Sequence, residues 1–145
     1  MMAGYSGKSV VQKLGIKPGF RIFVDGAPSS YDDVIGPLPA DVTLASRLKA
    51  PLEMAHLFAT EAAALRKKLP ACRDAIAPDG MIWVSWPKKS SGVASNVSEN
   101  VVRDTALSLG LVDIKVCAID DIWSGLKLVI PRDQRTTTAS AKRGK

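Results

Sequence analysis

Cysteine, histidine and aromatic residues are scarce in this sequence. Its 145 residues include two cysteines (Cys72 and Cys117), one histidine (His56) and only 6% aromatic residues. The two cysteines belong to no Cys-X-X-Cys or Cys/His cluster, which excludes a disulfide scaffold and leaves too few ligands for a zinc site. We therefore expect no metal site, a buried thiol at Cys72, and at His56 a strand histidine without a catalytic role.

Long hydrophobic runs are also absent. The longest stretch without a Lys, Arg, Asp or Glu runs only from Ser90 to Ser98, whereas a membrane-spanning helix needs about 20 apolar residues. The first residues, MMAGYSGKS, lack the apolar core of a secretory signal. The sequence therefore predicts a cytoplasmic protein with no membrane partner.

Positive charge is concentrated at the end of the chain. The net charge is +6, and segment 131–145 holds five basic residues against one acid, so that only +2 remains for residues 1–130. We expect one globular domain at 1–130 and a disordered basic tail at 131–145. Surfaces that bind nucleic acid specifically combine basic with stacking aromatic residues, and no such combination is evident, so no specific nucleic acid is expected.

Short apolar runs alternate with stretches of helical periodicity along most of the chain. Strands are predicted at 20–25, 42–45, 54–59 and 81–86, helices at 9–15, 30–35, 60–76 and 98–109, and a turn at 78–80. Period-two alternation at 112–118 and 126–130 predicts a closing hairpin. The predicted fold class is α/β: a small Rossmann-like three-layer sandwich, with a mainly parallel sheet and a C-terminal antiparallel hairpin.

The hairpin pattern also predicts which residues are buried. In its first arm the apolar residues Val112, Ile114, Val116 and Ala118 alternate with Asp113, Lys115 and Cys117. Such alternation is typical of a strand with one buried and one solvated face. If the chain is a protein–protein interaction module, we expect a flat or dimeric edge of the sheet at the second arm, 126–130.

The first candidate site is the polar loop after the strand at 81–86, where a sheet of this type binds ligands. Its candidate residues are Trp86, Lys88, Lys89, Ser90, Ser91 and Gly92. Two ammonium groups, two hydroxyls and free backbone N–H groups can bind a phosphate or carboxylate. The alternatives are a solvated basic loop and a tryptophan that only packs in the core.

The second candidate site lies in and after the hairpin link. Its residues are Asp120, Asp121, Trp123, Ser124 and Lys127. The two aspartates can pair with the lysines of the first loop if the loops are neighbours, or act only as turn formers. Trp123 can cover a ligand or pack against the sheet.

Three stretches resemble class I methyltransferases in their layout. They are KPGFRIFVDG, PDGMIWVSWP and the closing GLVDIKV…GLKLVI. The resemblance implies a site for S-adenosylmethionine, with a glycine-rich loop after the first strand and an acid after the second. Here the loop reads DGAPSS, with Gly26 as its one glycine, and the second strand ends in Ala45-Ser46-Arg47. These departures imply that the cofactor pocket is lost, so no cofactor is expected.

A second resemblance covers most of residues 3–128. The segments AGYSGK, KLGIKPG, WVSWPKKSSGVASNVSENVVRD and GLVDIKVCAIDDIWSGLK resemble a bacterial family, domain of unknown function 3052. This resemblance implies no particular activity, cofactor or catalytic residue.

Three functions from different classes are compatible with these observations. The first is a non-catalytic anion- or nucleotide-binding or regulatory module, with a small anionic ligand at the Lys88–Lys89 loop. The second is a divergent transferase-type enzyme whose site includes Asp120 and Asp121. The third is a protein–protein interaction module that contacts its partner through the tail or the hairpin edge. The sequence favours them in that order.

Overall fold

The computed structural model describes residues 9–134 of the chain. Its helices are α1 (Val10–Leu14), α2 (Tyr31–Ile35), α3 (Ala62–Ala75), the short 3-10 turn η1 (Lys89–Ser91) and α4 (Glu99–Ser108). Its strands are β1 (Arg21–Asp25), β2 (Thr43–Ala45), β3 (Leu52–Phe58), β4 (Ile76–Pro87), β5 (Val112–Ala118) and β6 (Trp123–Val129).

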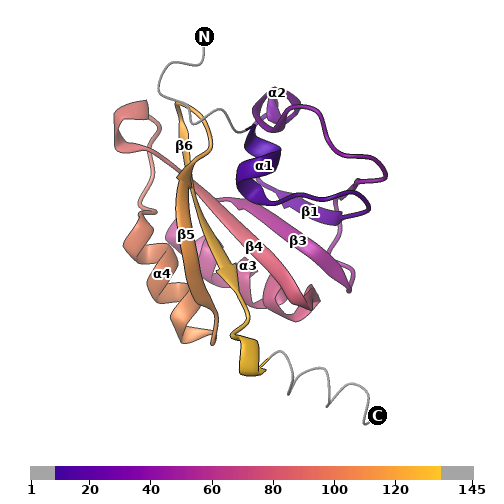
Figure 1. Cartoon of the computed structure of the whole chain (residues 1–145). Helices are drawn as coiled ribbons and strands as arrows, with labels where there is room; N and C mark the ends of the chain where they lie inside the picture. Colours follow the sequence, from indigo (N-terminus) through magenta and orange to yellow (C-terminus); the bar gives the residue numbers. More distant parts are fainter. Residues whose placement is uncertain (1–8, 135–145) are drawn as a thin grey trace.

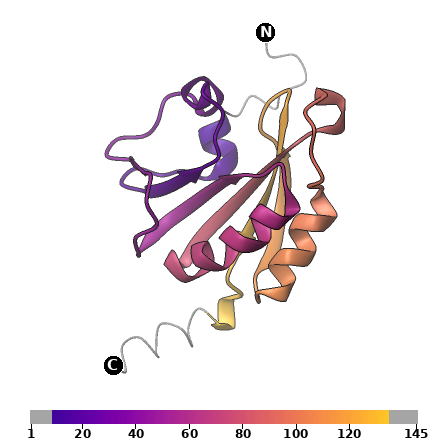
Figure 2. The ribbon, with the colours of Figure 1, turned by 180° about the vertical axis from the view of Figure 1, so that it is seen from behind.

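The six strands form one mixed sheet in the order β2-β1-β3-β4-β6-β5. The first four strands are parallel to one another, and β6 pairs antiparallel with both β4 and β5. Helices α1 and α2 cover one face of the sheet, and α3 and α4 cover the other (Figures 1 and 2). The predicted α/β three-layer architecture, with a mainly parallel sheet and a C-terminal hairpin, is confirmed.

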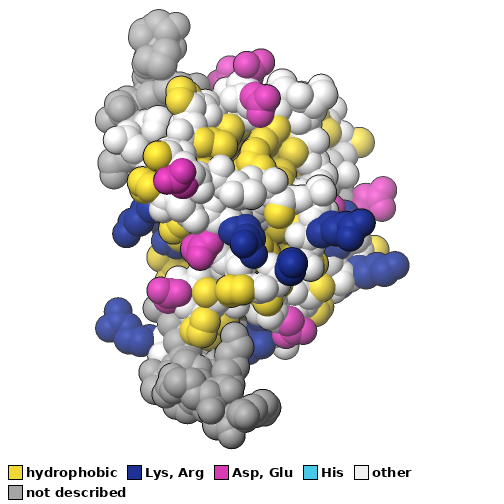
Figure 3. All heavy atoms as spheres, turned by 90° about the vertical axis from the view of Figure 1, so that its right-hand side faces the viewer, with side chains coloured by type: hydrophobic (Ala, Val, Ile, Leu, Met, Phe, Trp, Pro, Cys, Tyr) yellow, Lys and Arg dark blue, Asp and Glu magenta, His cyan; other side chains and the backbone are white. Residues whose placement is uncertain are grey.

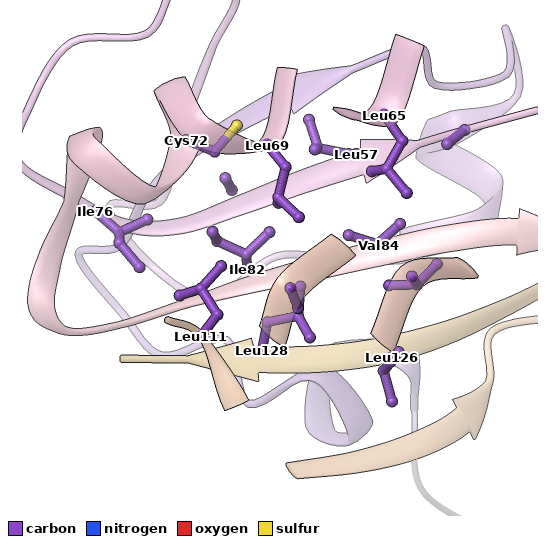
Figure 4. Close-up of a cluster of buried hydrophobic side chains, with 14 of the residues drawn as sticks. Leu57, Leu65, Leu69, Cys72, Ile76, Ile82, Val84, Leu111, Leu126 and Leu128 are labelled. Atoms are coloured by element: carbon purple, nitrogen blue, oxygen red, sulfur yellow. The ribbon is translucent and has the colours of Figure 1, made fainter. Parts of the chain in front are cut away.

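The larger core lies between the sheet and helices α3 and α4. Leu65, Leu69 and Cys72 of α3 recur at helical spacing, and all three are buried against the sheet. The strands supply apolar side chains to the same cluster, among them Leu57, Ile82, Val84, Leu126 and Leu128 (Figure 4). Burial of these side chains is the main stabilising term, at about 1.5–3 kcal/mol for each large one.

A smaller core lies on the opposite face, beneath α1 and α2. Trp83 is fully buried there, and its indole Nε1 donates a hydrogen bond to the carbonyl oxygen of Leu14 at 3.0 Å. Trp123 packs edge-on against Phe58, with ring centroids 5.0 Å apart. β3 therefore has both faces covered, as its unbroken apolar pattern predicts.

Local sequence signals locate several helix ends correctly. Ser98 caps α4, because its Oγ accepts a hydrogen bond from the backbone N–H of Val101 at 3.3 Å. Ser9 caps α1 in the same way and forms a capping box with Gln12. The turn predicted at 78–80 is wrong, because β4 continues through these residues. They lie at a shift of register in the pairing of β4 with β3.

The hairpin forms as predicted, but its arms are placed differently. β6 is an inner strand, paired on both sides, so the edge expected at 126–130 is wrong. The edge is β5, where Ile114 is 53% and Val116 is 47% exposed. The apolar residues of the alternating pattern are therefore not buried, and a register shift between Asp113 and Lys115 interrupts the pairing of β5 with β6 at Ile114.

The end of the chain lies largely outside the described residues. Of the predicted basic tail 131–145, the structure describes only residues 131–134, so the expected disorder is not tested. No helix within residues 9–134 combines the length and apolar character that a bilayer crossing requires.

The two arms of the hairpin differ in their expected tolerance to substitution. Leu126→Ala removes a fully buried side chain and should lower the free energy of unfolding by about 2–5 kcal/mol. Ile114→Thr, on the exposed edge strand, should change it by less than about 0.5 kcal/mol. Urea denaturation of both variants measures these effects, and a large loss in Ile114→Thr would contradict the exposed placement of β5.

Candidate functional site

The order of the strands reverses between β1 and β3, since the chain runs from β1 outward to β2 and then returns to the other side of β1. In open α/β sheets, ligands bind outside the carboxyl ends of the strands at such a point. A pocket of about 250 Å³ lies there. This switch-point pocket is lined by Asp25, Gly26, Leu57, Phe58, Ala59, Thr60, Glu61, Ala64, Leu65 and Lys68.

Gly26 allows β1 and β3 to end side by side at this pocket. Its φ is +73°, in the left-handed region, and a Cβ added to it would lie only 2.5 Å from the carbonyl oxygen of Phe58. Glycine is required for both reasons. The close backbone approach that Gly26 permits is therefore with the neighbouring strand.

Charged side chains stand at the mouth of the switch-point pocket. Lys68 Nζ of α3 is 2.5 Å from Asp25 Oδ2 at the end of β1, and the two side chains are 49% and 31% exposed. Glu61, just before α3, adds a second carboxylate. The wall beneath them is apolar, with Leu57, Phe58 and Leu65. The pocket thus combines an apolar floor with groups of both signs at its rim.

A second hollow lies one strand further along the same edge. It measures about 490 Å³ and is lined by Pro87, Lys89 and residues 92–98. Asn96 joins the two regions: its side-chain oxygen accepts from the N–H of Ala62 at 2.7 Å, and its own N–H donates to the carbonyl of Thr60 at 3.1 Å. The segment between β4 and α4 is therefore fixed to the start of α3, beside the switch-point pocket.

A buried hydrogen-bond chain crosses the opposite face of the sheet. Tyr31 Oη is 3.1 Å from His56 Nδ1, and His56 Nε2 is 2.9 Å from Ser85 Oγ. Burial, and secondarily the charge of Asp32, raises the pKa of Tyr31. Burial lowers the pKa of His56 to about 3, so the imidazole is neutral. The chain ties α2 to β3 and β4, and its members are too deeply buried to meet a substrate.

The residues of the first predicted site are only partly brought together. The backbone N–H of Lys88 donates to the carbonyl of Ile122 at 2.7 Å, so the two candidate loops are neighbours. Trp86, however, is buried in the core on the α3 and α4 side. Ser91 Oγ donates to the carbonyl of Lys88 at 2.6 Å and accepts from the N–H of Val93, and thus closes the loop on itself.

The rest of that loop is solvated. Lys89, Ser90 and Gly92 are exposed and Lys88 is half-buried. Gly92 ends η1 with a φ of +80°. Lys89 and Gly92 line the second hollow, whereas Ser90 lies outside its lining.

The residues of the second predicted site fall in three different places. Asp120 Oδ1 accepts hydrogen bonds from the N–H groups of Ile122 and Trp123, so Asp120 forms the turn, as one of the alternatives expects. Asp121 is exposed. Trp123 is buried in the core beneath α1 and α2, on the face opposite Trp86. Ser124 pairs in register with Trp86. Lys127 lines a separate hollow with Glu53 and Asp79, so it does not join the others.

Sequence reasoning did not single out the charged residues of the switch-point pocket. In the sequence, Asp25 and Gly26 indicate only a reduced version of a glycine-rich loop. Lys68 lies on the helix after β3 and Glu61 just before that helix, and only the adjacency of β1 and β3 brings them to Asp25. The position of Asp25 at the end of a strand was the one local signal available. Among residues 9–134, no group of three His, Cys, Asp or Glu side chains could hold a metal ion.

Comparison with solved structures shows similarity to methyltransferases. A methyltransferase from Aquifex aeolicus that depends on S-adenosylmethionine matches with a TM-score of 0.61 and 13% identity, over 84% of this chain and 88% of that one. The precorrin-6y C5,15-methyltransferase of Geobacter metallireducens matches with a TM-score of 0.58 and 9% identity, over 84% and 86%. The ribosomal protein L11 methylase of Lactobacillus delbrueckii matches with a TM-score of 0.57 and 11% identity, over 85% and 76%.

These similarities establish the fold as that of Rossmann-like methyltransferases. No family model and no curated protein sequence matches the chain, so the resemblance to domain of unknown function 3052 stays a prediction. The methyltransferase neighbours contradict the expectation of a non-catalytic anion- or nucleotide-binding module. The geometry agrees in part, because Trp86 and Trp123 are buried in the two cores on opposite faces of the sheet.

Gly26→Ala should destabilise the protein more than a substitution at a comparable glycine. At Gly19, φ is +82° and an added Cβ would meet nothing within 4 Å, so Gly19→Ala should cost about 1–2 kcal/mol from backbone strain alone. Gly26→Ala adds the clash with Phe58, and overpacking of this kind costs about 1–3 kcal/mol more. Urea denaturation measures both losses, and equal losses would contradict the contact between Gly26 and Phe58.

His56 should make the folded protein sensitive to mild acid. The unfolded chain binds this proton near pH 6.5 and the folded protein only near pH 3, so the stabilisation is complete above pH 6.5 and falls below it. At about 1.4 kcal/mol per pH unit, the free energy of unfolding should drop by about 2 kcal/mol between pH 8 and pH 5. Urea denaturation across this range tests it. His56→Gln should flatten the profile, and an unchanged slope in that variant would assign the effect to other groups.

Proposed function

We propose that this chain is a divergent transferase that binds S-adenosylmethionine in the switch-point pocket and transfers its methyl group. The observation that carries the proposal is the position of this pocket, at the carboxyl ends of β1 and β3. The sheet around it has the fold of methyltransferases, one of which, a magnesium protoporphyrin IX methyltransferase from Synechocystis, has been solved with S-adenosylmethionine bound.

The donor set of the pocket fits one end of this cofactor. S-adenosylmethionine carries a sulfonium cation and an amino-acid group, and the pocket rim carries the carboxylates of Asp25 and Glu61 and the ammonium of Lys68. At about 250 Å³, the pocket is below the roughly 300 Å³ at which sites for whole drug-sized ligands begin. It is thus suited to the charged end, while Ser46 and Arg47 after β2 offer no carboxylate to the ribose.

The residues of this chain would bind S-adenosylmethionine and orient its methyl group. When bound, S-adenosylmethionine supplies an activated methyl group. The carboxylates of Asp25 and Glu61 place negative charge at a rim that would face a sulfonium. Leu57, Phe58 and Leu65 exclude water from the floor. The second hollow, beyond Asn96, is open to solvent and accessible to an acceptor.

One face of the molecule can be described for its charge. On the face shown in Figure 3, which includes the side of α2 and β1, Lys and Arg side chains are interspersed with acidic and uncharged ones. A continuous basic surface of the kind that tracks a phosphate backbone is not formed on this face. This face therefore gives no support to a nucleic-acid acceptor.

A calorimetric titration with S-adenosylmethionine and S-adenosylhomocysteine tests the proposal directly. Ala64→Phe fills the switch-point pocket from α3 and should abolish binding, whereas Ala63→Phe, which is exposed and outside the pocket lining, should preserve it. In a thermal melt, either ligand at 100 times its Kd should raise the Tm of the parent by about 5–10 °C.

Two results would contradict the proposal. The first is the absence of binding by either ligand to the parent protein. The second is binding that survives Ala64→Phe and disappears in a Lys88→Ala/Lys89→Ala variant, which would place the site at the loop after β4 instead.

A further inference from the structure

The ion pair at the mouth of the switch-point pocket joins two elements that are distant in sequence. Asp25 ends β1, and Lys68 lies on the same side of α3 as Ala64 and Leu65, which also line the pocket. The contact between Lys68 Nζ and Asp25 Oδ2, at 2.5 Å, therefore spans the rim. A ligand that enters the pocket passes directly beside both charges.

This ion pair can be separated at little cost. Its side chains are 49% and 31% exposed, and exposed pairs contribute little to stability because water solvates both charges when they part. A zwitterionic ligand has an ammonium that can replace Lys68 as the partner of Asp25. Its carboxylate can replace Asp25 as the partner of Lys68. Exchange of partners then leaves no charge unpaired.

Lys68 is also the donor best placed for a carboxylate. Among the ten residues that line the pocket, Lys68 alone is cationic. Two neighbouring backbone donors are already engaged: the N–H of Ala59 donates to the carbonyl of Ser85 at 2.8 Å, and the N–H of Ala62 donates to Asn96. Among the lining side chains, only Lys68 can offer a carboxylate a charge-assisted hydrogen bond from a cationic donor.

We propose that Lys68 selects ligands with an α-amino-acid group, by exchanging Asp25 for the ligand carboxylate while Asp25 accepts from the ligand ammonium. The inference rests on the proposed function and deepens it, because it assigns the end of the cofactor that the pocket takes. Lys68 is in this sense a specificity-determining residue, with no part in the transfer itself.

The test compares two adenosyl ligands that differ in the amino-acid group. S-adenosylhomocysteine carries it, and 5′-methylthioadenosine lacks it. The parent should bind S-adenosylhomocysteine at least about tenfold more tightly, the effect of one charge-assisted hydrogen bond. Lys68→Met should remove that preference and leave the Kd for 5′-methylthioadenosine within about twofold. Isothermal titration calorimetry measures all four constants.

Two further variants separate this role from a general effect of charge. Lys67→Met removes the neighbouring cation of α3, which is exposed and outside the pocket lining, and should keep the preference of the parent. Lys68→Arg retains the charge and should keep most of the preference for S-adenosylhomocysteine. A loss of preference in Lys67→Met equal to that in Lys68→Met would overturn the assignment.

The remaining outcomes distinguish this inference from the function on which it rests. If the parent binds both ligands equally, or if Lys68→Met keeps the preference, the role of Lys68 is overturned and the proposed function stands. If the parent binds neither ligand, the proposed function fails, and the inference fails with it.

Discussion

The parallel pairing of β1 with β3 is the constraint on which the rest of this structure depends. It places Val24 beside His56 and Asp25 beside Leu57. Two strands that are separated in the sequence by β2 therefore end next to each other at the same edge of the sheet. Gly26 makes this possible, since a side chain at that position would meet the carbonyl of Phe58. The pocket, its ion pair and the start of α3 all follow from this one pairing.

The two faces of the sheet serve different purposes around that pairing. The face beneath α3 and α4 is almost entirely apolar and supplies most of the stability. The opposite face contains the polar chain from Tyr31 through His56 to Ser85, which fixes α2 on the sheet by directional bonds. A satisfied polar network of this kind specifies one arrangement of its elements, and here it holds the helix that follows the loop of Gly26.

Much of the architecture could be predicted from local patterns, because local patterns report capping and two-sided burial. The cap at Ser98, the covered strand at β3 and the hairpin are examples. The exposure of Ile114 could not be predicted, since it depends on the edge position of β5 and on a register shift at this residue. The contact between Lys68 and Asp25 could not be predicted either, because it depends on the order of the strands in the sheet. The residue types of the loop at Lys88 indicate an anion site, yet its hydroxyl and backbone groups partly satisfy one another.

The inner position of β6 bears on how this chain acquires its structure during synthesis. Within residues 9–134, β5 pairs in the sheet with β6 alone, so residues 112–118 leave the ribosome before their partner, residues 123–129, has been made. α4 reaches its final contacts with β6 only then as well. The parallel half can begin to assemble earlier, but the sheet is complete only when β6 has emerged and pairs with both β4 and β5. A nascent chain halted between these strands would expose the side of β4 that β6 later covers, an unpaired edge of the kind that invites aggregation.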